Sequence, residues 1–297
     1  MFEKILIPLD GSELAEKALI YGEEFGRRLG SEIILFHVCS PEHGQFERMH
    51  KIYLDNQAET LAREMREGQP ANAKVNVTAK IDGGKPSEAI CNLVEKEKIG
   101  LIIMTTAGVS GHKFGIIGSV ADNVSRTVII PTMLINPRKG IVIDKRQIIN
   151  RILVPLDGSD LSKLALPLAE ELAARLKVPI TLFQMARNYA SIGEPAPFVD
   201  YAKLTEDEEK KIRVEMTGLE KKLKEKGLAV TWSLTSGTDA AQEIINASEK
   251  IGAGLVVIST HGRSGLGKWV FGSVTEKVIR HGEAPLLLVH ARAGQAS

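Results

Sequence analysis

Two stretches of this chain each occur twice, and this repetition constrains the fold more than any other feature. Gly100 to Ile135 and Gly254 to Val289 share a glycine-rich pattern at an offset of 154 residues. Lys4 to Ser12 and Arg151 to Ser159 repeat at an offset of 147 residues. The offsets differ by 7, which predicts an insertion in the second copy, within Asn188 to Lys203. A period near 150 residues is too long for a solenoid repeat, so the sequence predicts a duplicated domain.

The longer repeat predicts a strand, a glycine-rich loop, a helix and a further strand. Leu255 to Ile258 is a continuous aliphatic run, typical of a strand buried on both faces. Ser273 to Glu276 has the form of a capping box, which predicts that Ser273 caps a helix. Ser119 has the same position in the first copy. A strand, a glycine loop and a helix N-terminus present backbone N–H groups and a positive dipole end to an anion.

Outside the longer repeat, strands and helices also alternate in both copies. In the first copy we expect strands near 5–9, 33–38 and 75–79 and helices near 13–29, 45–67 and 87–97. In the second we expect strands at 151–156, 179–185, 228–234, 254–259 and 285–290 and helices near 160–176, 204–226 and 239–250. Such alternation predicts a parallel sheet with right-handed crossovers.

The order of the strands decides where a ligand would bind. Five parallel strands commonly take the order 2-1-3-4-5 or 3-2-1-4-5. In the second order the switch point lies between strands 1 and 4, whose carboxyl ends carry Pro8 to Ser12 and Gly108 to Ser119 in the first copy. The segments that repeat best would therefore line one crevice. Core packing alone would instead make the buried strands match best.

Composition narrows the class of protein. The 297 residues fit two domains, with 43% hydrophobic and 25% charged residues, as in globular proteins. A net charge of +1 argues against nucleic-acid and membrane partners, and no apolar run approaches the roughly 20 residues of a membrane span. Met1 to Asp10 lacks a signal-peptide pattern, and Cys39 and Cys91 have no counterparts in the second copy. We expect a cytoplasmic protein without disulfides or a cysteine-based metal site.

The repeated motifs resemble those of the universal stress protein family. The signature of that family is Gly, two residues, Gly, nine residues, and then Gly followed by Ser or Thr. Gly108 to Ser119 and Gly262 to Ser273 fit its second part, and Asp-Gly-Ser follows the first strand of both copies. Thr105 and Ser259 stand in place of the leading glycine.

The resemblance implies an α/β fold with two domains, residues 1–137 and 150–293, joined by a linker at 138–149. Each domain would be Rossmann-like, of the adenine nucleotide alpha hydrolase-like type. Each would have a five-stranded parallel sheet of order 3-2-1-4-5 with helices on both faces. In the family the final strands pair between domains, which would here involve Val128 to Leu134 and Leu286 to His290. This implies an intramolecular pseudo-dimer and leaves a homodimer of two chains open.

The resemblance also implies an adenine nucleotide ligand, ATP accompanied by Mg²⁺. Asp157 would bind the nucleoside end, Met185 would border the adenine, and the N–H groups of Ser273 and Val274 would hold phosphate oxygens. The candidate residues are Pro155, Leu156, Asp157, Met185, Ser259, Gly262, Gly265, Gly272, Ser273 and Val274 in the second copy, and Pro8, Leu9, Asp10, Val38, Gly108, Gly111, Gly118, Ser119 and Val120 in the first. Because Thr105 is bulkier than Ser259, we expect the second copy to bind better. No residue is assigned to a metal, since the seven histidines are scattered.

Three functions agree with these patterns. The first is an ATP-binding stress-response protein in which nucleotide tunes conformation or assembly. The second is a nucleotide-free structural or adaptor protein, which the replaced leading glycines favour. A slow ATPase ranks last, because no general base or arginine finger is identifiable, so we expect no catalytic residues and at most weak hydrolysis. Gly262 to Lys268 mimics a P-loop, but Trp269 stands where Ser or Thr is required.

Overall fold

The computed structural model describes residues 2–39, 47–70, 74–109, 116–137, 148–189, 199–260 and 271–290. The first half of the chain contains β1 (Lys4–Pro8), α1 (Glu13–Glu16), α2 (Leu19–Leu29), β2 (Glu32–Cys39), α3 (Glu47–Arg66), β3 (Val77–Gly83), α4 (Pro86–Glu97), β4 (Leu101–Thr105), α5 (Ser119–Thr127) and β5 (Thr132–Ile135). The second half contains β6 (Ile152–Leu156), α6 (Asp160–Lys163), α7 (Leu166–Leu176), β7 (Ile180–Arg187), α8 (Tyr201–Glu225), β8 (Val230–Gly237), α9 (Ala240–Lys250), β9 (Leu255–Thr260), α10 (Ser273–His281) and β10 (Leu286–His290).

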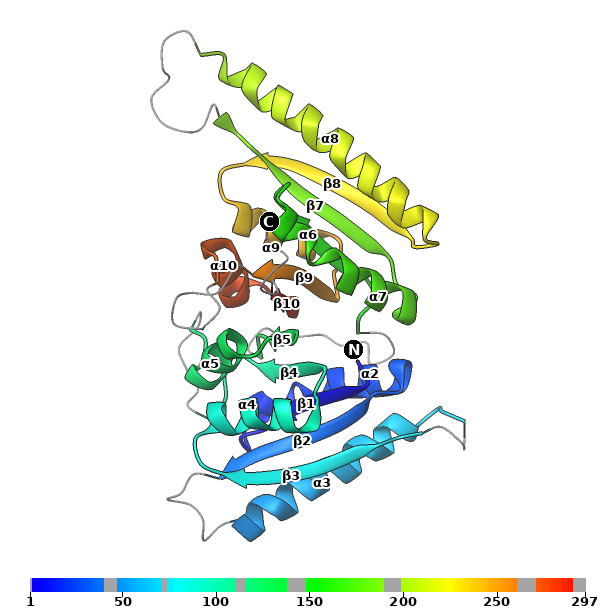
Figure 1. The fold of residues 1–297 in the computed structure, drawn as a ribbon, viewed down its shortest axis with the longest axis vertical. Coiled ribbons are helices and arrows are strands. Elements are labelled where there is room, and N and C mark those ends of the chain that lie inside the picture. The colour runs from blue at the N-terminus through cyan, green and yellow to red at the C-terminus, as the bar shows by residue number, and fades with distance from the viewer. Residues whose placement is uncertain are drawn as a thin grey trace.

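The ten strands form one continuous sheet with the order β3-β2-β1-β4-β5-β10-β9-β6-β7-β8 (Figure 1). Each half has the predicted order 3-2-1-4-5, and its strands run parallel. The halves meet where β5 and β10 pair antiparallel, with Leu287 opposite Met133. The predicted pairing of the final strands is therefore confirmed, and the two halves form an intramolecular pseudo-dimer.

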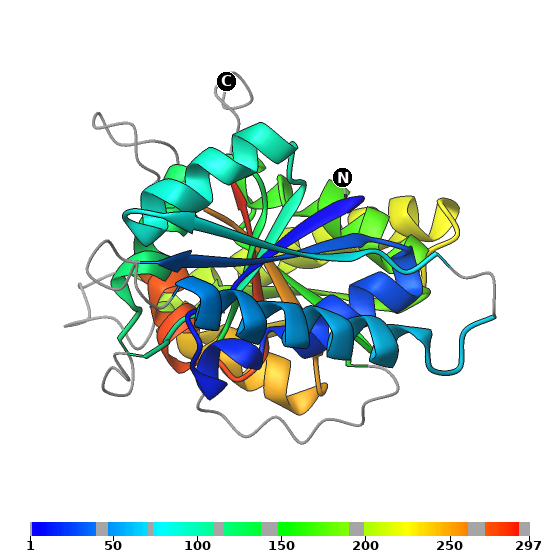
Figure 2. The same ribbon diagram turned by 90° about the horizontal axis from the view of Figure 1, so that it is seen from below.

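Helices cover both faces of this sheet, as Figure 2 shows for the first half, where α3 lies on one side of the strands and α4 on the other. Successive residues of a strand point to opposite faces. Accordingly, Ile5 and Ile7 pack on the side of α2 and α3, and Leu6 packs on the side of α4 and α5. Each of the two hydrophobic clusters continues through both halves, which accounts for the all-apolar composition of the central strands.

Polar contacts also join the halves. Arg28 on α2 forms an ion pair of 2.6 Å with Glu24 and donates hydrogen bonds to the carbonyl oxygens of Ile149 and Leu176. On the opposite face of the sheet, the guanidinium of Arg126 lies 4.1 Å from the centre of the Phe271 ring, which precedes α10. Arg28 and Arg126 of the first half therefore contact residues of the second half on opposite faces of the sheet.

Two predicted helices differ from the structure. The predicted helix 13–29 is interrupted at Lys17 and Ala18, and the predicted helix 160–176 is interrupted at Leu164 and Ala165. The cause is a tightened turn, in which the Ala18 N–H bonds the carbonyl of Ala15 at 3.0 Å, three residues back instead of four. Within the described residues, no helix has the length and apolar character needed to cross a membrane. Residues 138–147 of the predicted linker lie outside the described residues.

Candidate functional site

A crevice opens in each half at the point where strand order reverses. β1 pairs with β2 on one side and with β4 on the other, and β6 pairs likewise with β7 and β9. The crevice between the carboxyl ends of β1 and β4 has a volume of about 410 Å³, and that between β6 and β9 has about 370 Å³. Both volumes lie in the range of small-molecule sites, so each half contains a crevice of ligand size at its switch point.

The predicted site residues that the structure describes all line these crevices. Those of the first crevice are Pro8, Leu9, Asp10, Val38, Gly108, Gly118, Ser119 and Val120. Those of the second are Pro155, Leu156, Asp157, Met185, Ser259, Gly272, Ser273 and Val274. Gly111, Gly262 and Gly265 lie outside the described residues. The structure therefore brings together residues from three separate segments of each half.

A helix begins at the edge of each crevice. Ser119 and Ser273 are the first residues of α5 and α10, and the capping positions are held by Gly118 and Gly272. The prediction that the two serines cap these helices is therefore wrong, because the extended conformation that a cap requires falls one residue earlier (ψ 148° at Gly118 and 156° at Gly272).

The displaced cap has a chemical consequence. A glycine has no side chain with which to cap the first N–H groups of a helix, and no side chain caps either helix here. The hydroxyls of Ser119 and Ser273 make no hydrogen bond with any residue in the described part of the chain. Both helix starts therefore offer backbone donors and a hydroxyl donor to an anion in the crevice.

Asp10 connects the two sides of the first crevice. Its Oδ1 accepts hydrogen bonds from the N–H and the hydroxyl of Ser12, at 3.0 and 2.6 Å. Its Oδ2 accepts a bond of 2.7 Å from the N–H of Val109, in the segment that follows β4. A Cβ atom on Gly108 would lie 1.9 Å from this Oδ2, so the contact requires glycine at position 108. The Asp10 carboxylate thus holds the two strand ends together.

Asp157 has the corresponding place in the second crevice. Its Oδ1 accepts hydrogen bonds from the N–H and hydroxyl of Ser159, at 2.9 and 2.6 Å. Burial alone raises the pKa of Asp157, but the hydrogen bonds from Ser159 and Ser162 outweigh burial and hold the pKa below its ordinary value. The second crevice therefore contains an ionised carboxylate at neutral pH, placed to accept hydrogen bonds from a ligand.

The residues that replace the leading glycine lie in regular strands. Thr105 is the last residue of β4 and pairs with Ile135, and Ser259 lies within β9 and pairs with Val289. Neither has a positive φ, so these positions do not require glycine for backbone conformation. The Thr105 hydroxyl donates to the carbonyl of Ala107 at 2.7 Å and is thereby held within its own strand end.

Sequence reasoning missed several polar residues of the second crevice, namely Ser162, Gln184, Arg187 and Glu208. Arg187 ends β7, and its N–H donates to the Glu208 carboxylate at 3.2 Å. Gln184 and Arg187, near the end of the strand predicted at 179–185, were a usable signal, whereas Glu208 is one of many charged residues on α8. Among the described residues that line the first crevice there is no Lys or Arg. The second crevice therefore has the more polar lining.

Comparison with known proteins agrees with this architecture. The sequence profile of the Universal stress protein family matches residues 1–136 and 149–290. Rv2623, a universal stress protein of Mycobacterium tuberculosis, is 23% identical over 96% of this chain and 95% of its own length. The Bacillus subtilis protein YxiE is 30% identical over 47% of this chain and 98% of its own length.

A solved structure has the same arrangement of both halves. The crystal structure of a universal stress protein from Archaeoglobus fulgidus superposes with a TM-score of 0.68 at 20% identity, and the match covers 98% of this chain and 99% of that one. At this identity the likeness concerns the fold. Because the family profile matches both halves, this chain belongs to the universal stress protein family, with two of the family's domains in tandem.

Proposed function

We propose that this protein is an adenine nucleotide-binding regulator of a stress response, and that ATP occupies the switch-point crevices. The observation that carries the proposal is the pair of uncapped helix starts, Ser119 and Ser273, each at the edge of a crevice of ligand size. A triphosphate there would meet backbone N–H groups, a serine hydroxyl and the positive end of a helix dipole. Mg²⁺ would accompany the phosphates, and no described residue is assigned to it.

The base and sugar would lie on the opposite side of the crevice. In the second half, Met185 and Ile258 supply apolar contact for a base, and Asp157 supplies an acceptor for ribose hydroxyls. In the first half, Val38 and Asp10 hold the corresponding positions. This division of polar and apolar groups suits an amphipathic ligand with one anionic end.

The second crevice is the stronger nucleotide site. Arg187 brings a cation to its mouth, whereas Asp10 in the first crevice already accepts hydrogen bonds on both carboxylate oxygens. This contrast also supports a divided role, in which the second half binds nucleotide and the first half is structural. Occupancy of either crevice would act on the shared sheet and would tune the conformation or assembly of the pseudo-dimer. We place the protein in the cytoplasm, where Cys39 and Cys91 remain free thiols.

Equilibrium dialysis of the full chain against ATP with Mg²⁺ tests the proposal. We expect saturable binding, with the tighter site lost or weakened about tenfold in Ser273→Ala, since a charge-assisted hydrogen bond contributes about 1.5 kcal/mol. Ser119→Ala is the matched control, because it removes the equivalent hydroxyl from the weaker crevice and leaves the tighter site unchanged. Absence of ATP uptake at millimolar nucleotide would leave the nucleotide-free adaptor as the better account.

A further inference from the structure

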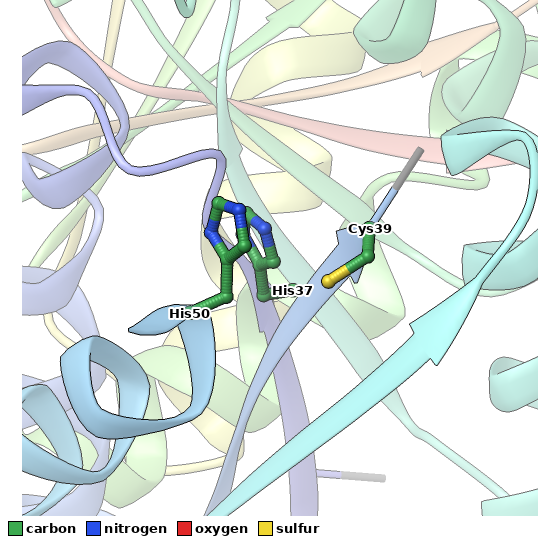
Figure 3. Close-up of side chains that lie close together, drawn as sticks. All are labelled: His37, Cys39 and His50. Carbon is green, nitrogen blue, oxygen red and sulfur yellow. The ribbon is translucent and has the colours of Figure 1, made fainter. Parts of the chain in front are cut away.

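A cluster of three metal-ligating side chains lies in the first half, behind the crevice on the α3 side of the sheet. His37 and Cys39 come from the end of β2, and His50 comes from the first turns of α3 (Figure 3). In a strand, residues two apart share a face, so His37 and Cys39 both point toward α3. One ligand atom from each of the three side chains lies within 4.8 Å of the other two. His50 thus meets two residues that lie 11 and 13 positions earlier in the sequence.

We propose that His37, Cys39 and His50 form a binding site for a thiophilic divalent cation of the Zn²⁺ type. Two imidazoles and one thiolate are a ligand set that Zn²⁺ binds tetrahedrally, with the fourth position taken by water in sites of three protein ligands. Ligand bonds of about 2.0 to 2.3 Å place ligand atoms roughly 3.5 Å apart. Since the three ligand atoms all lie within 4.8 Å of one another, the proposed site would close by side-chain adjustment.

The hydrogen bonding of His37 prepares it as a ligand. Its Nδ1 lies 2.8 Å from the carbonyl oxygen of Leu9, which can only accept, so Nδ1 carries the proton. The other ring nitrogen, Nε2, then has a free lone pair, and a histidine anchored through a backbone carbonyl is the usual arrangement at metal centres.

The second ring lacks such an anchor. The His50 ring stacks on His37 with ring centres 4.4 Å apart and planes at 18°, and it makes no hydrogen bond with a residue in the described part of the chain. Cys39 is buried, with 7% of its surface exposed, and its Sγ lies on the same side as the two rings (Figure 3). A bound cation would provide a ligand bond to the His50 ring and to the Cys39 sulfur. Binding forms a metal–sulfur bond and releases the thiol proton of Cys39 to solvent.

The second half supplies an internal comparison. The pairing of Pro8 with Phe36 and of Pro155 with Phe183 aligns the two halves, so that Gln184 and Ala186 replace His37 and Cys39. The buried and partly buried apolar residues of the long helices also correspond: Leu54, Ala58, Leu61 and Met65 in α3 match Ile212, Met216, Leu219 and Leu223 in α8. This alignment places Glu208 at the position of His50. The same fold therefore forms without the three ligands, which argues that they are not needed for packing.

Metal titration of the full chain tests the site. The reduced protein, stripped of metal with a chelator, is titrated first with Co²⁺ and then with Zn²⁺. We expect one equivalent of Co²⁺ to bind, with a thiolate-to-cobalt charge-transfer band and the ligand-field bands of tetrahedral cobalt, and Zn²⁺ to remove both signals. Cys91→Ser, which alters a free cysteine outside the cluster, should bind as the wild type does.

The decisive variants replace the three proposed ligands by the residues found at the corresponding positions of the second half. Cys39→Ala should lose the charge-transfer band, and the triple variant His37→Gln, Cys39→Ala, His50→Glu should bind Zn²⁺ at least about tenfold more weakly. Unfolding in metal-free buffer should stay close to that of wild type, which separates lost ligands from lost fold. Absence of cobalt signals in wild type at millimolar Co²⁺, or an unchanged band in Cys39→Ala, would overturn the proposal. Nucleotide binding enters neither result, so the test is independent of the proposed function.

Discussion

The Oδ2 atom of Asp10 accepts a hydrogen bond of 2.7 Å from the N–H of Val109, a residue 99 positions later in the chain. Asp10 follows β1, and Val109 follows β4, so this bond crosses the switch point of the first half. It fixes the distance between the two strand ends that form the first crevice. Variants of Gly108 and Asp10 test this geometry.

Gly108→Ala should destabilise the protein by about 1 to 3 kcal/mol, measured by urea unfolding. Its Cβ would lie 1.9 Å from Asp10 Oδ2 and would displace the carboxylate from Val109. Gly83→Ala is the matched control, since a Cβ there meets no atom within 4 Å and its φ is not positive. A Gly108→Ala protein as stable as the Gly83→Ala protein would show that the carboxylate contact is dispensable.

Asp10→Ala should remove the partner with which the new methyl group collides. The combined Asp10→Ala, Gly108→Ala protein should therefore lose less free energy of unfolding than the two single changes add up to, by about 1 kcal/mol. Urea unfolding of all four proteins completes the double-mutant cycle. Additive losses would mean that Gly108 and Asp10 act on stability independently.

Asp157 should contribute to stability in a pH-dependent way. Because its folded pKa lies below the ordinary value of 3.8, its contribution is fully present above that value and is lost as pH falls through the folded pKa. The difference in unfolding free energy between wild type and Asp157→Asn should therefore shrink between about pH 5 and about pH 2. Comparing the two proteins cancels other carboxylates that titrate there. A difference that stays constant over this range would contradict the assigned hydrogen bonds.

Arg28→Met should cost about 3 kcal/mol of stability, measured by urea unfolding, because it leaves Glu24 buried without its cation. The Glu24 side chain is 5% exposed, and Arg28 also loses its hydrogen bond of 3.1 Å to the carbonyl of Ile149. The double variant Arg28→Met, Glu24→Gln should recover much of the loss, since the unpaired charge is gone. A loss below about 1 kcal/mol in the single variant would show that the contacts of Arg28 contribute little to stability.

The alternation of strands and helices left two strand orders open, and the resemblance to the universal stress protein family implied the order that the structure has. The position of the crevices could be predicted because of the duplication. Segments such as Pro8 to Ser12 and Pro155 to Ser159 repeat because they occupy equivalent places at the two switch points. Strands such as 254–259 were predicted to within one or two residues, since an unbroken aliphatic run has few alternatives to a doubly buried strand.

What the sequence did not predict depends on backbone geometry or on tertiary contact. Ser273 matched a capping box, but the capping conformation belongs to Gly272, and a pattern of residue types does not specify ψ. The cluster of His37, Cys39 and His50 joins a strand to the next helix, and no spacing rule for metal ligands describes it. Glu208 reaches the second crevice from α8, whose charged residues look alike in sequence.

The most direct measurement of the central claim is a crystal structure of the full chain grown with ATP and Mg²⁺. The account predicts nucleotide in the second crevice, with phosphate oxygens at hydrogen-bond distance from the N–H groups of Ser273 and Val274 and the ribose beside Asp157. The crevice bordered by β6 and β9 found empty under saturating ATP, or nucleotide bound only outside the two switch-point crevices, would contradict it.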